Sequence, residues 1–342
     1  MTPRPDRPAS DELHRTNNPI SGGPLPRQVL GAYLQVVLAG LLWATAGPFS
    51  ILMHRMGVPP ESVALLRPAA GAAFLILFFV LFRRGERRMP EPLPLLAMVL
   101  GGGLIVAVFH MAFQFSTIAV GVPATVALLY LAPAIVLVLS VPLFREPLTL
   151  VRALLAATSV AGVWLTVFGA RGAEVALTPR GLAWGALSGC GYAAYILFGK
   201  GFGRVHGPLT PLLWSTLGGV GILGVTWLVR NDPLVLPPDA AAWGVLLVFG
   251  LLTVTTSSLL LFHAMRTLEA GRAAIGTTVE PLAATLLAIV FLDQVLTAAG
   301  WCGLVLLMLG VAGAYALPSR SLSDHAGPEY PPGPHPPPDS GR

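Results

Sequence analysis

The sequence predicts an all-α membrane protein with ten transmembrane helices in two inverted five-helix repeats. The prediction rests on composition, on long apolar runs, and on residue positions that recur at a nearly constant offset. Of the 342 residues, 54% are hydrophobic and only 11% are charged, and the mean hydropathy is +0.74. A soluble domain carries roughly a quarter charged residues because its surface faces water. The composition therefore favours a membrane protein.

Ten apolar runs are long enough to cross a bilayer, which takes about 20 helical residues at 1.5 Å each. We expect the spans at residues 29–49, 63–82, 94–113, 123–143, 148–169, 181–200, 209–229, 241–263, 273–292 and 296–316. The segments outside them, 1–28 and 318–342, are polar and rich in proline. Such segments bury little, so we expect two disordered tails.

Basic residues are distributed unevenly between the two sides of the predicted membrane. With the N-terminus inside, sixteen of the 21 basic residues are cytoplasmic, four are external, and Arg67 lies within a span. Cytoplasmic loops are enriched in Lys and Arg, so we expect both termini in the cytoplasm. Lys200 stands against twenty arginines, which is typical of a GC-rich bacterial gene, and we expect the protein in the bacterial inner membrane. The same loop bias explains the net charge of +5 without a nucleic-acid partner.

The two halves of the chain share residues at offsets of 148 or 149 positions. The pairs are Pro133 and Pro281, Glu146 and Gln294, Thr149 and Thr297, Gly162 and Gly310, Val163 and Val311, Gly40 and Gly189, and Trp43 and Tyr192. We therefore expect two five-helix repeats, at 29–170 and 180–317. Because five is odd, the second repeat enters the membrane upside down. Inverted repeats are common in secondary transporters, whose halves rock around a central site.

Two segments resemble the EamA-type unit of the drug/metabolite transporter superfamily. The first half has Leu131–Pro133 followed by Phe144–Thr149, and the second has Glu280–Pro281 followed by Phe291–Thr297. The resemblance covers residues 29–317. It implies ten helices around a central cavity and export of amino acids, metabolites or toxic small molecules. Gln294 departs from the glutamate usual at its position, which we expect to change loop packing more than transport.

Glu280 is the acidic residue predicted deepest in a span, about 11–12 Å from the cytoplasmic end of the ninth helix. An ionised carboxylate at such a position costs roughly 2.5–3.5 kcal/mol. It must therefore face a wet cavity, be paired, or stay protonated. These states suit proton coupling or the binding of a cationic substrate group, but a structural bond beside Pro281 is an equal alternative. The repeat counterpart of Glu280 is Ala132, so the charge has no acidic twin.

Seven further residues are candidates for the substrate path because they place polar groups inside the spans. They are Thr255, Thr256, Thr277, Trp43, Tyr192, Tyr130 and His110. Hydroxyls also bond between helices or to their own helix, and aromatic rings also pack, so each has a structural alternative. We expect Arg67 to snorkel to the outer interface. Cys190 and Cys302 are expected to be small packing residues.

The sequence lacks the motifs of a phosphate-binding loop, a hydrolase or a metal centre. We therefore expect no enzymatic activity, no cofactor and no metal site. The expected function is a secondary transporter that exports small organic solutes by alternating access, with a small-molecule substrate, the lipid bilayer and protons as candidate partners. The alternative is a non-transporting membrane scaffold or accessory subunit. The oligomeric state stays open, because the glycines could pack helices within or between chains.

Overall fold

The computed structural model describes residues 27–82, 90–144, 148–172, 175–230, 233–265, 267–268 and 270–316. Within this part of the chain, ten helical segments are long and apolar enough to cross a membrane, as predicted. The predicted tails lie outside the described residues, except that α1 already begins at residue 27.

Each repeat contains five spans, and three spans of the first repeat and two of the second are divided into several elements. The first repeat comprises α1 (Arg27–Ala44) with α2 (Ala46–Arg55), α3 (Pro60–Phe82), α4 (Pro92–Leu96) with the π-helix η1 (Ala97–Gly102) and α5 (Gly103–Val120), α6 (Val122–Leu129) with α7 (Ala132–Phe144), and α8 (Leu150–Gly169). The second comprises α9 (Pro179–His206), α10 (Leu209–Arg230), α11 (Ala240–Gly250) with the π-helix η2 (Leu251–Thr256) and α12 (Ser257–Ala264), α13 (Ala270–Thr277) with α14 (Val279–Leu292), and α15 (Ala298–Ala316).

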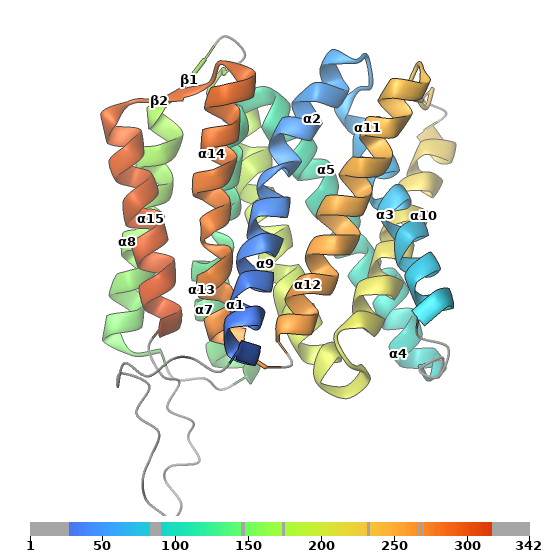
Figure 1. Cartoon of the computed structure of the whole chain (residues 1–342), viewed down its shortest axis with the longest axis horizontal. Helices are drawn as coiled ribbons and strands as arrows, with labels where there is room; N and C mark the ends of the chain where they lie inside the picture. The colour runs from blue at the N-terminus through green and yellow to red at the C-terminus, as the bar shows by residue number, and fades with distance from the viewer. Residues whose placement is uncertain are drawn as a thin grey trace, which may run out of the picture.

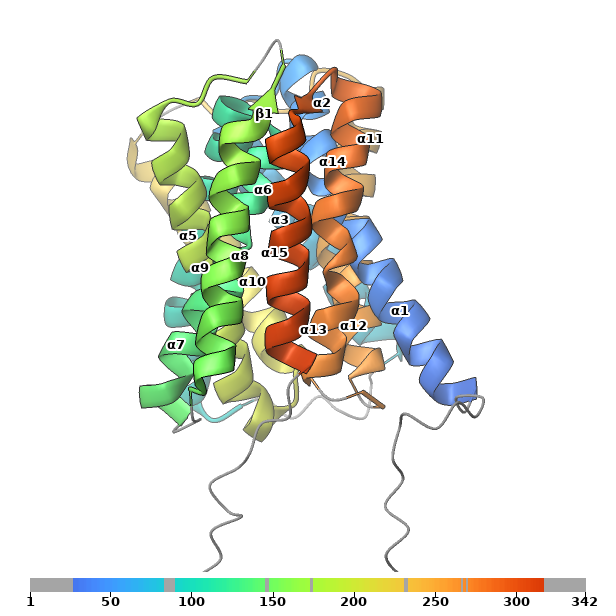
Figure 2. The same cartoon turned by 90° about the vertical axis from the view of Figure 1, so that its left-hand side faces the viewer.

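The spans run alternately up and down in one bundle (Figures 1 and 2). The start of α1 and the end of α15 lie at the same end of the bundle, which we call the termini side. Strands β1 (Ala170–Arg171) and β2 (Val295–Leu296) pair antiparallel at the other end, the hairpin side. The first repeat begins at the termini side and the second, with α9, at the hairpin side, so the repeats are inverted.

Three spans are longer than the apolar runs that predicted them. The first span extends over Gln28–Arg55, the third over Pro92–Val120 and the sixth over Pro179–His206. The additional turns contain polar residues such as Gln114, which is fully buried. A polar side chain at a helix end lowers the hydropathy of the run but does not end the backbone hydrogen bonding, so hydropathy alone places the boundaries too early.

The fourth span of each repeat is broken at the same repeat position. In the first repeat the helix is interrupted at Tyr130 and Leu131, and in the second at Thr278, which is 148 residues after Tyr130. A proline follows each break three residues on, Pro133 and Pro281. Proline has no N–H and cannot donate to the carbonyl four residues before it. Discontinuous spans of this kind form the binding sites of many transporters with inverted repeats.

Glycines let the first helix of each repeat approach the broken span of the other repeat. A Cβ on Gly40 of α1 would lie 2.8 Å from Val279 Cγ1, just beyond the break in the ninth span. A Cβ on Gly189 of α9 would lie 2.6 Å from the Leu128 carbonyl oxygen, just before the break in the fourth span. Because Gly40 and Gly189 are repeat partners, the two halves interlock through equivalent contacts.

The last helices of the two repeats, α8 and α15, lie side by side along one edge of the bundle (Figure 1). A Cβ on Gly303 would lie 2.5 Å from the backbone nitrogen of Thr166, and one on Gly310 would lie 2.6 Å from that of Ser159. The helix backbones are therefore almost in contact. The β1–β2 ladder closes the pair at the hairpin side.

Gln294 also joins the repeats at the hairpin side. Its side chain is fully buried, and its Oε1 accepts a hydrogen bond of 2.8 Å from the backbone nitrogen of Val122, the first residue of α6. The expectation for the cysteines is wrong. Cys190 and Cys302 are both exposed, because they lie on faces of α9 and α15 that turn away from the other helices.

Candidate functional site

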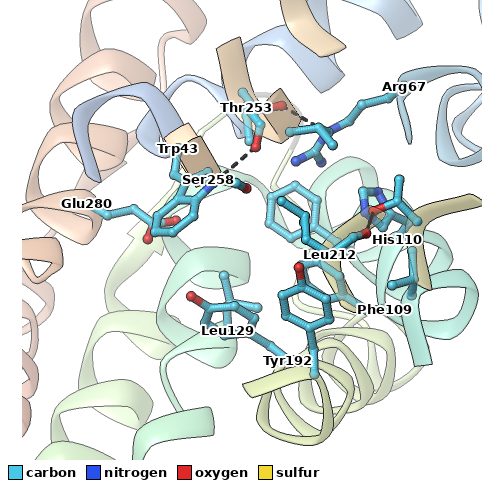
Figure 3. Close-up of a pocket in the computed structure, with 16 residues that line it drawn as sticks. Trp43, Arg67, Phe109, His110, Leu129, Tyr192, Leu212, Thr253, Ser258 and Glu280 are labelled. Atoms are coloured by element: carbon cyan, nitrogen blue, oxygen red, sulfur yellow. Dashed lines mark hydrogen bonds between the residues drawn. The ribbon is translucent and has the colours of Figure 1, made fainter. Parts of the chain in front are cut away.

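A cavity lies among the helices of both repeats (Figure 3), with about 700 Å³ of empty space when the part open to the outside is included. Eight of the ten spans supply its lining, and among the described residues none from α8 or α15 takes part. The lining residues are Trp43, Ala46, Arg67, Val106, Phe109, His110, Phe113, Leu129, Tyr192, Tyr195, Leu212, Thr216, Thr253, Val254, Ser258 and Glu280. An apolar and aromatic wall with a few polar groups suits a small organic molecule.

Half of the residues selected from the sequence line this cavity. Those that do are Glu280, Trp43, Tyr192 and His110. Trp43 and Tyr192 are repeat partners, so both halves place an aromatic ring at the same kind of position. Tyr192 stacks on Phe109 with 5.6 Å between ring centres, and His110 meets Phe109 edge to face at 5.1 Å.

The remaining selected residues lie outside the lining. Thr255 donates a hydrogen bond of 2.9 Å to the carbonyl oxygen of Gly71, so it joins η2 to α3. Thr256 is half-buried at the end of η2. Tyr130 is outside the lining too, and its hydroxyl contacts both the lining residue Glu280 and the backbone carbonyl of Thr277.

Tyr130 connects the two broken spans through Glu280. Its hydroxyl oxygen lies 3.1 Å from Glu280 Oε2 and 2.9 Å from the carbonyl oxygen of Thr277. The Thr277 carbonyl is open to this contact because Pro281, four residues later, has no N–H to donate. Thr277 and Glu280 are at the break between α13 and α14, Tyr130 is at the break between α6 and α7, and Glu280 is only 6% exposed.

The Tyr130 hydroxyl has one proton and two neighbouring acceptors. When Glu280 is ionised, the hydroxyl can donate to its carboxylate. When Glu280 is protonated, the carboxyl group can donate to the Tyr130 oxygen, and the hydroxyl then donates to the Thr277 carbonyl. Both acceptors are within hydrogen-bond distance of the hydroxyl, so the geometry accommodates both arrangements.

Arg67 is the cation of the cavity, and the expectation that it snorkels to the interface is wrong. Its side chain is 5% exposed and turns inward (Figure 3). Nε donates a hydrogen bond of 3.1 Å to Thr253 Oγ1, and the guanidinium carbon lies 4.7 Å from the centre of the Phe249 ring and 5.7 Å from that of Phe113. Nη1 is buried and has no hydrogen-bond partner among the described residues. Arg67 turns inward because it lies on the face of α3 that packs against η2 and α5.

Thr253 organises the polar side of the cavity. Its carbonyl oxygen accepts hydrogen bonds from Trp43 Nε1 at 3.0 Å and from the Ser257 hydroxyl at 3.0 Å. Its own hydroxyl donates to the Phe249 carbonyl and accepts from Arg67. The hydroxyl-rich segment 253–258 was recognisable in the sequence, but η2 is π-helical and changes the register of the side chains. Thr253 and Ser258 therefore face the cavity.

Inverted five-helix repeats around a shared central cavity define a class of membrane transport proteins. The chain belongs to the EamA-like transporter family of the drug/metabolite transporter superfamily, which it matches over residues 30–168 and 179–316. It is therefore a multi-pass membrane protein of a transporter family.

Comparisons with individual proteins agree with this assignment. The uncharacterized transporter YwfM of Bacillus subtilis (strain 168) is 24% identical over 307 residues, which cover 86% of this chain and 96% of YwfM. The threonine/homoserine exporter RhtA of Salmonella typhimurium (strain SL1344) is 33% identical over 187 residues, which cover 54% of this chain and 57% of RhtA. A solved crystal structure superposes with a TM-score of 0.58 at 20% identity, over 83% of this chain and 96% of the other, and shows the fold alone.

Proposed function

We propose that this protein is a secondary transporter that exports a small organic solute across a bacterial inner membrane by alternating access, with protonation of Glu280 coupled to transport. The observation that carries the proposal is a central cavity built by both repeats, with a buried carboxylate at the break of one span. A carboxylate inside the membrane is costly unless it has a function or a partner.

The interlocked repeats support alternating access. Helix α1 packs against the break in the ninth span, and α9 packs against the break in the fourth. A tilt of one first helix therefore moves the broken span of the opposite repeat. The eight spans that line the cavity can rearrange around it, while α8 and α15 stay paired outside it.

The contacts of Tyr130 support proton coupling. Loss of the Glu280 proton transfers the Tyr130 hydrogen bond from the Thr277 carbonyl to the carboxylate. Both acceptors are beside the break between α13 and α14, so the transfer changes which part of the ninth span is held against the fourth. A proton on Glu280 thereby alters the contact between the two broken spans.

The similarity to RhtA supports amino acids or related metabolites as substrates and export as the direction, since that relative is a threonine/homoserine exporter. The distribution of basic residues supports a termini side that faces the cytoplasm.

Transport by the purified full-length chain in lipid vesicles tests the proposal. Wild-type protein is expected to accumulate a labelled metabolite when a pH gradient is imposed. Glu280→Gln is expected to lose the gradient-driven accumulation and keep exchange of the solute at equal concentrations, because the amide preserves the shape but carries no exchangeable charge. Glu61→Gln, at the start of α3 and outside the cavity lining, is the matched control.

Undiminished and still pH-dependent transport by Glu280→Gln would exclude Glu280 from the coupling. Vesicles that move no solute while the chain binds a specific protein partner would favour the scaffold alternative.

A further inference from the structure

We propose that Arg67 is the anion-binding residue of the cavity and that it binds the carboxylate of the transported solute. This inference rests on the proposed transport function and adds the chemistry by which the cavity selects its substrate. Arg67 is the lining residue with an always-charged cationic head.

The charge of Arg67 is incompletely satisfied by its described neighbours. Arg67 is 5% exposed, and its environment provides one hydroxyl partner and two aromatic rings. Cation–π contacts favour the guanidinium group but satisfy none of its in-plane N–H donors. Nη1 is left without a partner among the described residues. Glu280 attracts Arg67 through space but bonds to Tyr130, so the open N–H donors of Arg67 can bind a carboxylate that enters the cavity.

The planar guanidinium group of Arg67 has a shape that fits a carboxylate. The Phe249 ring and the hydrogen bond to Thr253 hold the guanidinium plane in place. The planar fork of arginine binds a carboxylate through two parallel hydrogen bonds, which a lysine ammonium group does not reproduce. Fixing the plane in advance lowers the entropy lost when a carboxylate binds.

Glu280 places an acidic side chain in the lining of the same cavity. Figure 3 shows Arg67 and Glu280 toward opposite sides of the group of lining residues. Arg67 bonds to Thr253 and Glu280 to Tyr130, so the two charged side chains use other partners. A solute that carries both a carboxylate and an ammonium group complements both charges. The aromatic walls then accommodate its side chain.

Paired solutes test the inference in vesicles that contain the full-length chain. The labelled probes are L-serine, L-leucine and L-phenylalanine, each beside its amide. The amide keeps the ammonium group and the side chain but has no carboxylate. We expect at least one acid to be transported with an affinity at least about tenfold higher than that of its amide, because charge-assisted hydrogen bonds discriminate on this scale.

Variants of Arg67 assign that preference to the residue. Arg67→Gln is expected to lower the affinity for the acid about tenfold or more, to the level of the amide, while the affinity for the amide is unchanged. Binding of the amide also shows that the variant is folded. Arg67→Lys is expected to recover part of the preference. Arg171→Gln is the control, because Arg171 bonds to the carbonyls of Phe168 and Ala170 outside the cavity.

An acid preference that survives in Arg67→Gln would overturn the inference, as would a wild-type protein that takes amides as well as acids. Transport of carboxylate-free solutes alone would overturn the role of Arg67 and leave the transport function intact. Vesicles that move none of the six probes, nor any other solute, would contradict both.

Discussion

The hydroxyl of Tyr130 has one proton but lies beside two hydrogen-bond acceptors. The Thr277 carbonyl and the Glu280 carboxyl group are 147 and 150 residues after Tyr130 in the chain, and both are within hydrogen-bond distance of its hydroxyl. Tyr130 and Glu280 are both buried, so a hydrogen-bond acceptor that loses its partner there is left unsatisfied. Tyr130, which contacts the Glu280 carboxyl group, is therefore in the opposite repeat from it.

Replacement of Tyr130 by phenylalanine tests this role. We expect Tyr130→Phe to lower the free energy of unfolding by about 1–3 kcal/mol, because a buried carbonyl and a buried carboxyl group lose their common partner. We also expect transport to depend less on pH, since protonation of Glu280 no longer moves a hydrogen bond between the broken spans. Thermal unfolding and transport rates over a pH series measure the two effects.

Tyr33→Phe is the matched control, because Tyr33 lies in α1 and outside the cavity lining. A pH profile of Tyr130→Phe that coincides with that of the wild type would contradict the proposed switch.

At the scale of the elements, the breaks in the fourth and ninth spans are paired with tight glycine contacts. Pro133 and Pro281 open the backbone of each broken span, and Gly189 and Gly40 bring the opposing first helix close to the opening. The sequence contains both pairs as repeat partners. The contacts of the two glycines are visible only in the packed bundle, because each glycine lies against the broken span of the other repeat.

Two alanine substitutions in the same helix separate this contact from helix propensity. In Gly189→Ala the new Cβ would lie 2.6 Å from the Leu128 carbonyl oxygen, so we expect a loss of about 1–3 kcal/mol of stability. In Gly199→Ala nothing lies within 4 Å of the new Cβ, so we expect a gain of up to about 1 kcal/mol, because alanine favours a helix. Thermal unfolding of both variants in one detergent measures the difference. Equal shifts of the same sign would contradict the close approach of α9 to the fourth span.

At the scale of the whole molecule, the ten spans divide into a pair and a surrounding group. Helices α8 and α15 are joined through glycines and the β1–β2 ladder, and the other eight spans enclose the cavity. The inversion of the repeats places both described chain ends at the termini side. The side of the membrane that each end faces follows from the basic residues and is a prediction.

Reporter fusions determine the orientation. We expect a fluorescent protein fused after the last residue to be fluorescent, since it would fold in the cytoplasm. We expect alkaline phosphatase inserted between α10 and α11, at residue 236, to be active, because that loop lies at the hairpin side and would be external. Active phosphatase at the C-terminus, with an inactive fusion at residue 236, would reverse the orientation.

The sequence by itself determined the number of spans, the inverted repeat, the family and the presence of one deep carboxylate, Glu280. These properties depend on the length of the apolar runs, the offset between repeated residues and the depth of a residue in its span. Each of them can be counted along the chain, whichever helices pack beside one another. Even the hydroxyl-rich segment 253–258 could be recognised as a polar stretch inside a span.

Only the tertiary structure decided which side chains face the cavity and what they contact. Arg67 points inward because of the rotation of α3, and a π-helical turn directs Thr253 and Ser258, in place of Thr255, to the lining. The proposed role of Tyr130 depends on its contact with the carboxyl group of Glu280, which is 150 residues later in the chain. Helix rotation and the pairing of distant spans come from the packing of all helices together, so no local pattern in the sequence specifies them.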